Sequence, residues 1–386
     1  MTETNQQPFD VSHLRPRLHK VMDFAASQVS ELAANHPDYF PMYTENGRWK
    51  HSGSLWTDWC AGFLGGQMWL LEEYTGESSW RELAEHYSQL VEFKQHDRDV
   101  HDLGFIFLNT YRPWYLRTGS KRLNNVLITA GRTLAMRFME KGRYLRSFVA
   151  PESLFIDIMM NVPIIFYAAH ETGDKALFDL AVEHCRTTQK WIVRDDGSTA
   201  HEGIFDLETG AFLKQTTHQG LSGDSRWTRG LAWSLYGYTQ VYQFTKDVTD
   251  LEVARSNADC FIKHLLGSES WVPAWDFDAP AIPDRQPDTS AGAIAASGLW
   301  TLADEIEKHD QSTALQYRRA ALKMIEALTQ DELMGWSTPG WEGILKRGVY
   351  HTHKKLGVDE SVMWGEYFFL EAVMKVLRTH ESVQMI

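Results

Sequence analysis

The feature that most constrains this chain is a turn that recurs between pairs of amphipathic segments. Thr-Gly stands at 75–76, 118–119 and 172–173, each time after a stretch with helical spacing of apolar residues and shortly before another. Glycine favours the left-handed conformation that ends a helix, so each copy predicts a helix, a tight turn and a second helix. The same periodicity predicts twelve helices in all, near 11–34, 59–74, 78–93, 103–117, 120–140, 152–171, 174–193, 228–244, 249–266, 290–308, 312–329 and 359–378.

Short connections within helix pairs alternate with long connections between pairs. Twelve antiparallel helices in a flat row would leave apolar surface exposed, so we expect a closed ring of six inner and six outer helices, an all-α (α/α)6 barrel. The first helix then packs beside the last helix and closes the ring. Residues 1–386 then form a single domain, with 1–10 as a flexible tail. The long connections should gather on one face, at 35–58, 95–102, 141–151, 194–227, 267–289 and 330–358.

Composition excludes several classes of function. The net charge of −13, with no basic stripe, argues against a nucleic-acid partner. No apolar run approaches the roughly 20 residues of a membrane helix, and the polar N-terminus does not resemble a secretory signal. Cys60, Cys185 and Cys260 lack metal-type spacing, which favours reduced core thiols in a cytoplasmic protein. The chain has no phosphate loop or dinucleotide fingerprint, so we expect no cofactor.

Two aspartates are candidate acid–base groups on the face with the long connections. Asp102 follows His101 at the start of a predicted helix, where it is either an N-cap or a site residue. Asp157 lies in an apolar stretch, one turn into a helix that Pro163 should kink. Burial, and Asp102 nearby, should raise the pKa of Asp157 above about 3.9 and leave it poised as an acid. The alternative is a structural Asp157 hydrogen-bonded to Asn161.

Aromatic and basic residues suggest a site for an anionic sugar. Trp56 stands just outside a predicted helix, where a role in the core is less expected. Arg229 shares a helix face with Trp233 and follows Trp227, an arrangement that suits a sugar carboxylate. Simple packing of Arg229 on a Trp ring is the alternative. A basic cluster in the last long connection is either a contact for an anionic group or a solvated loop, and its histidines do not favour a metal site: Lys346, Arg347, His351, His353, Lys354 and Lys355.

Seven segments, in order and at matching spacing, resemble the unsaturated glucuronyl hydrolases of glycoside hydrolase family 88 over about 56–369. The segments are WTD at 56–58, HDLGF at 101–105, IDIMMNVP at 156–163, THQG at 217–220, WTRGLAW at 227–233, WDF at 275–277 and RGVYH at 347–351. The resemblance implies an (α/α)6 barrel in which Asp157 is the general acid/base and Asp102 its partner. It also implies substrate contacts at Trp56, His101, His218, Gln219, Trp227, Arg229 and Trp233.

One departure concerns the outer part of the implied site. Some members of the family place a Trp before the sixth helix, where this chain has Phe148. The preference for the second sugar should differ accordingly. Phe148, Lys354 and Lys355 are therefore our candidates for contacts with an outer sugar or a sulfate group.

The resemblance also implies a substrate and a reaction. The substrate is an oligosaccharide left by a polysaccharide lyase, of the glycosaminoglycan type, with a C4=C5 double bond in its non-reducing uronate. Protonation at C4 and addition of water at C5 give a hemiketal that opens and releases the next sugar. One Asp acting through water can serve as donor and base, while the other carboxylate stabilises positive charge. We expect a monomer or weak homo-oligomer.

Three alternatives remain open on the sequence. The first is an unsaturated rhamnogalacturonyl hydrolase with the same fold and chemistry. The second is a sugar epimerase, which needs paired catalytic histidines, with His101 and His218 as the candidates. The third is a barrel that binds sugars without catalysis. Substrate panels and the behaviour of the two aspartates separate these functions.

Overall fold

The Thr-Gly turns form as the sequence predicts. Gly76, Gly119 and Gly173 each end a helix with φ between +64° and +72°, the left-handed conformation that costs glycine little. The hydroxyl of each preceding threonine donates to the carbonyl four residues earlier, at 2.7–3.1 Å. The turn is therefore one structural device used three times.

The computed structural model describes residues 10–50, 59–268, 270–280 and 285–379.

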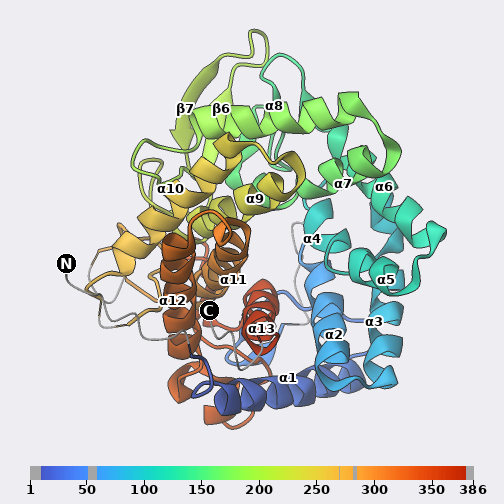
Figure 1. Cartoon of the computed structure of the whole chain (residues 1–386), viewed down its shortest axis with the longest axis vertical. Helices are drawn as coiled ribbons and strands as arrows, with labels where there is room; N and C mark the ends of the chain where they lie inside the picture. The colour runs from blue at the N-terminus through green and yellow to red at the C-terminus, as the bar shows by residue number, and fades with distance from the viewer. Residues whose placement is uncertain (1–9, 51–58, 269, 281–284, 380–386) are drawn as a thin grey trace.

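The described helices form two concentric rings (Figure 1). Each inner element packs against the next, and the last packs back against the first, which closes the barrel. The inner elements are α2 (Ala61–Thr75), α4 (Leu103–Phe107) with α5 (Tyr111–Thr118), α7 (Pro163–Thr172), α9 (Thr228–Thr245), α11 (Thr289–Ile306) and α13 (Met363–Leu377). The outer helices are α1 (Arg15–Asn35), α3 (Ser78–Leu90), α6 (Lys121–Ala135), α8 (Lys175–Trp191), α10 (Val248–Leu265) and α12 (Gln311–Leu328).

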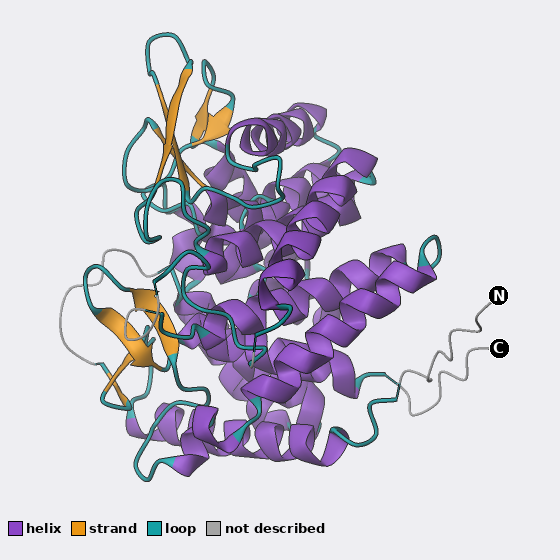
Figure 2. Ribbon diagram, turned by 90° about the vertical axis from the view of Figure 1, so that its left-hand side faces the viewer, coloured by secondary structure: helices purple, strands orange, loops and turns teal. Residues whose placement is uncertain are grey.

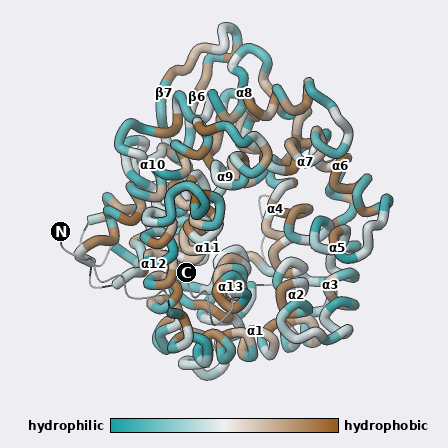
Figure 3. The backbone as a smooth tube through the Cα atoms, in the orientation of Figure 1, coloured by the Kyte–Doolittle hydropathy of each residue, from teal (hydrophilic) through white to brown (hydrophobic). Residues whose placement is uncertain are grey.

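Burial explains which helix joins which ring. Helix α11 is buried on nearly every side, and its small residues allow neighbouring backbones to approach closely: a Cβ on Gly298 would lie 2.4 Å from Leu235 of α9. The outer helix α8 instead buries only some of its residues, and hydrophilic and hydrophobic residues alternate along it in Figure 3. Helix α1 packs against both α2 and α13, which confirms the predicted closure.

The long connections contain short antiparallel strands that helical periodicity does not predict. The strands gather at one end of the helices (Figure 2). Their pairs are β1–β2, β3–β4, β5–β6–β7 and β8–β9. Their bounds are Thr44–Glu45, Arg48–Trp49, Phe138–Met139, Tyr144–Leu145, Ser153–Phe155, Glu202–Phe205, Phe212–Thr216, Gly348–His351 and Leu356–Glu360; the 3-10 helices are η1 (Glu92–His96), η2 (Ile156–Met160), η3 (Asp331–Leu333) and η4 (Gly335–Ser337).

Two predicted helices are wrong in their extent. The helix expected at 103–117 is broken between α4 and α5, where the hydroxyl of Thr110 donates to the carbonyl of Ile106 at 2.6 Å. Pro113 lacks the N–H that a continuous helix needs there. The helix expected at 152–171 begins only at Pro163, because proline is well suited to a first turn and poorly suited to a helix interior. No helix in the described part of the chain is long and apolar enough to cross a membrane.

Candidate active site

Two carboxyl groups face one narrow cavity at the end of the barrel that carries the strands. Asp102 immediately precedes α4, and Asp157 lies in η2, between β5 and α7. Both side chains are largely buried, with exposed fractions of 5% and 14%. The cavity contains about 390 Å³ not filled by protein atoms and is lined by Trp59, His101, Asp102, Phe148, Phe155, Asp157, Gln219, Arg229 and Tyr350.

Strand pairing, rather than an α-helix, orients Asp157. Strand β5 pairs with β6, and the N–H of Ile156 donates to the carbonyl of His201 at 3.0 Å. The expected position of Asp157 one turn into an α-helix is therefore wrong. Its expected hydrogen bond with Asn161 is also different, since the Asn161 amide donates to the backbone carbonyl of Asp157, at 3.2 Å, and not to its carboxylate.

His101 directs an N–H toward Asp102. Its Nδ1 accepts the backbone N–H of Phe148 at 3.0 Å, so the proton of the neutral ring is on Nε2. That nitrogen lies 3.4 Å from Oδ1 of Asp102. Burial, and then the charge of Arg137, lowers the pKa of His101 to about 3, so the ring is neutral at ordinary pH.

His201 likewise directs an N–H toward Asp157. Its Nδ1 accepts the backbone N–H groups of His218 and Gln219, at 3.0 and 3.1 Å. Its Nε2 lies 3.5 Å from Oδ2 of Asp157. Each carboxyl group therefore faces one imidazole whose tautomer is fixed by backbone donors. No sequence motif identified His201, because its role depends on the pairing of β5 with β6.

The two carboxyl groups differ in protonation, in the direction opposite to the one expected. Burial, followed by the negative charge of Asp157, raises the pKa of Asp102 well above 3.8. Burial also raises the pKa of Asp157, but the neighbouring His201 ring, followed by His101 and Arg229, outweighs burial and lowers that pKa below 3.8. At neutral pH Asp157 is therefore ionised. Of the two groups, Asp102 is therefore the one that keeps its proton to higher pH.

The guanidinium of Arg229 is held in place by other residues of the protein. Its guanidinium stacks on Trp227, at 4.7 Å, and on Trp364, at 5.2 Å. Nη1 contacts Oδ2 of Asp288 at 3.4 Å and donates to the carbonyl of Val349. Nη2 donates to the carbonyl of Tyr350, at 2.9 Å, and to Oε1 of Gln219. The remaining effect of Arg229 on the cavity is its positive charge.

The other expected contacts divide into three groups. Trp227 and Trp233 are buried and do not line the cavity; Trp233 packs against Phe105 and Phe368, as a core residue does. His218 is half-buried between Phe155 and His351, at ring distances of 5.8 and 5.6 Å, and also does not line it. Trp56 lies outside the described residues. Lys354 and Lys355 are exposed near His353, whose ring contacts the carbonyl of Gly220 at 2.7 Å.

Three lining residues were not singled out in the sequence: Trp59, Phe155 and Tyr350. His201, which contacts Asp157, was also missed. Tyr350 lies in β8, and its ring packs against Trp59 and Trp364. Burial raises the pKa of Tyr350 well above 10, so its hydroxyl stays protonated. Aromatic rings therefore form one wall of the cavity, which suits the apolar face of a sugar.

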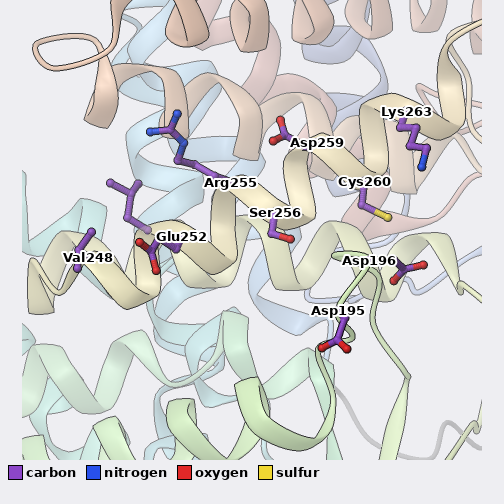
Figure 4. Close-up of a pocket in the computed structure, with 10 residues that line it drawn as sticks. Asp195, Asp196, Val248, Glu252, Arg255, Ser256, Asp259, Cys260 and Lys263 are labelled. Atoms are coloured by element: carbon purple, nitrogen blue, oxygen red, sulfur yellow. The ribbon is translucent and has the colours of Figure 1, made fainter.

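A wider hollow lies on the outer ring and has no such organisation. It contains about 1040 Å³ and is lined by residues of α10 and of the turn at Asp195 and Asp196 (Figure 4). Asp196 forms an ion pair with Arg226, at 2.9 Å, and Asp259 accepts a hydrogen bond from Tyr317. Across the described part of the chain, no three His, Cys, Asp or Glu side chains are grouped to hold a metal ion. All three cysteines are buried and free, as expected.

Comparison with known proteins gives one consistent family. The family described as Glycosyl Hydrolase Family 88 matches residues 29–332. The unsaturated chondroitin disaccharide hydrolase of Streptococcus pneumoniae is 31% identical over 329 residues, spanning 83% of this chain and 82% of that protein. Unsaturated glucuronyl hydrolase from Bacillus sp. GL1 superimposes with a TM-score of 0.88 at 27% identity, covering 94% and 97% of the two chains.

A third similar protein was solved with a sugar bound. It is an unsaturated glucuronyl hydrolase variant from Streptococcus agalactiae, complexed with dGlcA-GalNAc6S. It is 28% identical, with a TM-score of 0.79, and the match covers 94% of this chain and 91% of that one. These relatives confirm the predicted barrel.

Proposed function

The chain belongs to glycosyl hydrolase family 88, and on that premise we propose that it releases the unsaturated uronic acid from the non-reducing end of lyase-generated, glycosaminoglycan-type oligosaccharides. The observation that carries the proposal is the unequal carboxyl pair. Asp102 and Asp157 face one cavity, the first with a raised pKa and the second with a lowered one. Such a pair supplies an acid and a base at the same pH.

The reaction consumes one water and breaks one glycosidic bond. The C4=C5 bond is part of an enol ether, so a proton added at C4 leaves positive charge that C5 shares with the ring oxygen. The oxygen of water then bonds to C5 as its proton leaves. The resulting hemiketal opens, and the next sugar departs with its hydroxyl. The rule that relates carboxylate separation to retention or inversion does not apply, because water attacks C5 and not the anomeric carbon.

In this proposal the two aspartates divide the proton transfers. Asp102 donates the proton to C4, and ionised Asp157 accepts the proton of the attacking water. After one turnover the proton is on Asp157, and it returns to Asp102 because the pKa of Asp102 is the higher one. His101 and His201 keep each carboxyl oriented. The charge of Arg229 favours the uronate carboxylate in the cavity and stabilises ionised Asp157.

The direct test is a panel of unsaturated disaccharides. The product of C5 hydration lacks the conjugated double bond, so activity appears as loss of ultraviolet absorbance. We expect glucuronyl-hexosamine substrates to be hydrolysed faster than an unsaturated galacturonyl-rhamnose. The reverse order would favour the rhamnogalacturonyl alternative, and epimerisation of a saturated N-acylhexosamine would contradict the proposal altogether.

We propose that Lys354 and Lys355 contact a sulfate group on the outer part of the substrate. The supporting observation is their exposure beside His353, which contacts the loop of Gln219 and Gly220 at the cavity. Replacing both with Ala should lower kcat/KM about tenfold for a sulfated disaccharide, and much less for its unsulfated counterpart. Replacing Lys175 and Lys190 on outer helix α8 is the charge-matched control. An equal loss on both substrates would remove the sulfate contact.

Three wider proposals accompany this function. The buried residues form one continuous core, which supports a single catalytic domain. Three free cysteines suit a reducing compartment and support a cytoplasmic location. We also propose a monomer or weak homo-oligomer.

A further inference from the structure

Asp102 immediately precedes helix α4, but its side chain does not cap that helix. An Asp at the N-cap position ordinarily accepts the backbone N–H of the second or third helical residue. The Asp102 side chain makes no such bond, and its Oδ2 has no hydrogen-bond partner among the described residues. The aspartates at the N-caps of α8, α10, α11 and α12 all do accept one. The carboxyl group of Asp102 therefore does not cap the helix, although Asp102 stands at the N-cap position.

Asn161 caps α4 instead of Asp102. Its Oδ1 accepts the N–H of Phe105, the third residue of α4, at 2.8 Å. Its Nδ2 donates to the backbone carbonyl of Asp157, at 3.2 Å. The Asn161 side chain is fully buried, and a Cβ on Gly104 would lie 2.5 Å from its Cα. One amide thus joins the two segments that carry the carboxyl pair, and a glycine allows the segments to approach.

We propose that Asn161 is a positioning residue that caps α4 from outside and so keeps the Asp102 carboxyl free for proton transfer. The proposal rests on the function proposed above. Without Asn161, Asp102 stands at the N-cap position, from which an Asp side chain ordinarily accepts the N–H of the third helical residue, here Phe105. Rotation of Asp102 toward its own helix would turn the group away from the cavity.

The protonation of Asp102 should depend on this arrangement. A carboxylate that accepts a backbone N–H has a lower pKa than one that does not. The other groups that act on Asp102 are His101 beside it, Asp157 of η2 and Asp97, which raise its pKa or are neutral, and Arg137 after α6, which lowers it. Tyr350 of β8 is also near and stays protonated. Replacing Asn161 leaves the identity of all these groups unchanged, although it also removes the hydrogen bond to the backbone carbonyl of Asp157.

The first experiment measures kcat/KM against pH for the full chain. In Asn161→Ala we expect the alkaline limb to move about one unit or more to lower pH, and kcat/KM at pH 7 to fall about ten- to hundredfold. Asn161→Ser is measured beside it, in case the alanine variant does not fold, with the same expected direction. The control is Asp174→Ala, which removes the ordinary N-cap bond of outer helix α8 to Leu177, 3.1 Å long. It should lower stability and leave the pH profile in place.

The second experiment does not depend on activity, so it separates failure of this proposal from failure of the proposed function. Asp102→Ala is made in the wild type and in Asn161→Ala (or Asn161→Ser), and thermal unfolding is measured at pH 7. We expect the change to leave the unfolding midpoint unchanged or higher in the wild type, and to lower it where Asp102 has become the cap. An equal effect in both backgrounds, or an unshifted alkaline limb in the Asn161 variants, would overturn the proposal.

Discussion

Replacing Asp157 with Asn is expected to lower kcat/KM on an unsaturated disaccharide by about 10³-fold or more while leaving the barrel folded. The amide keeps the shape of the carboxylate and its contact with His201, but it cannot accept a proton from water. General base catalysis typically contributes about 10²–10⁴-fold. The decay of ultraviolet absorbance gives the rate, and circular dichroism gives the fold.

Binding is the control for this variant. Because Asp157 acts on water in our proposal, the variant should still bind the disaccharide, which titration calorimetry measures. Lost binding together with lost activity would mean that Asp157 holds the substrate. Activity within a factor of a few of the wild type would contradict the assignment of Asp157 as base.

Replacing Asp102 with Asn is expected to lower activity by at least about 10²-fold and to make the protein more stable at neutral pH. The raised pKa of Asp102 means that the folded protein holds a proton that the unfolded chain releases above about pH 4. Stability therefore falls as pH rises from about 4 through the folded pKa. Asn does not titrate, so the variant gains over the wild type in that window, by about 1.4 kcal/mol per pKa unit. Urea unfolding at pH 4 and pH 8 measures the difference.

Asp157→Asn provides a control of opposite sign. The lowered pKa of Asp157 contributes stability above its unfolded pKa of about 3.9, and this contribution is lost as pH falls through the folded pKa. That variant should lose stability at pH 8 and match the wild type only at strongly acidic pH. If both Asn variants shifted stability in the same direction at pH 8, the unequal protonation of the pair would be wrong. If Asp102→Asn kept normal activity, Asp157 alone would handle both protons.

The ring of helices could be read from the sequence because its signals are local. A glycine in the left-handed conformation, as at Gly76, depends on only a few residues around it. Where prediction failed, a single proline or a distant partner decided the outcome. Pro163 starts α7 and does not kink a longer helix, and Ser153–Phe155 becomes a strand only because β6 lies beside it.

The two aspartates could be picked out from the sequence, but the electrostatics of the site could not. Asp102 and Asp157 stood out as carboxylates at the start of helices or in apolar surroundings, and the structure brings both to one cavity. Their protonation could not be inferred, since it depends on His201, which is 44 residues from Asp157 in the chain and carries no local signal. Arg229 was recognised, but its binding by carbonyls of β8 depends on a contact across 120 residues.

That long-range contact has a consequence for biosynthesis. Val349 and Tyr350, whose carbonyls secure Arg229, are synthesised after both aspartates, and α13 completes the ring only after them. The segments that supply both aspartates are synthesised earlier, and their cavity is open on one side until residues 349 and 350 are present. A polypeptide that ends before Val349 therefore carries the acid–base pair without the carbonyls that hold Arg229, and we expect it to be inactive.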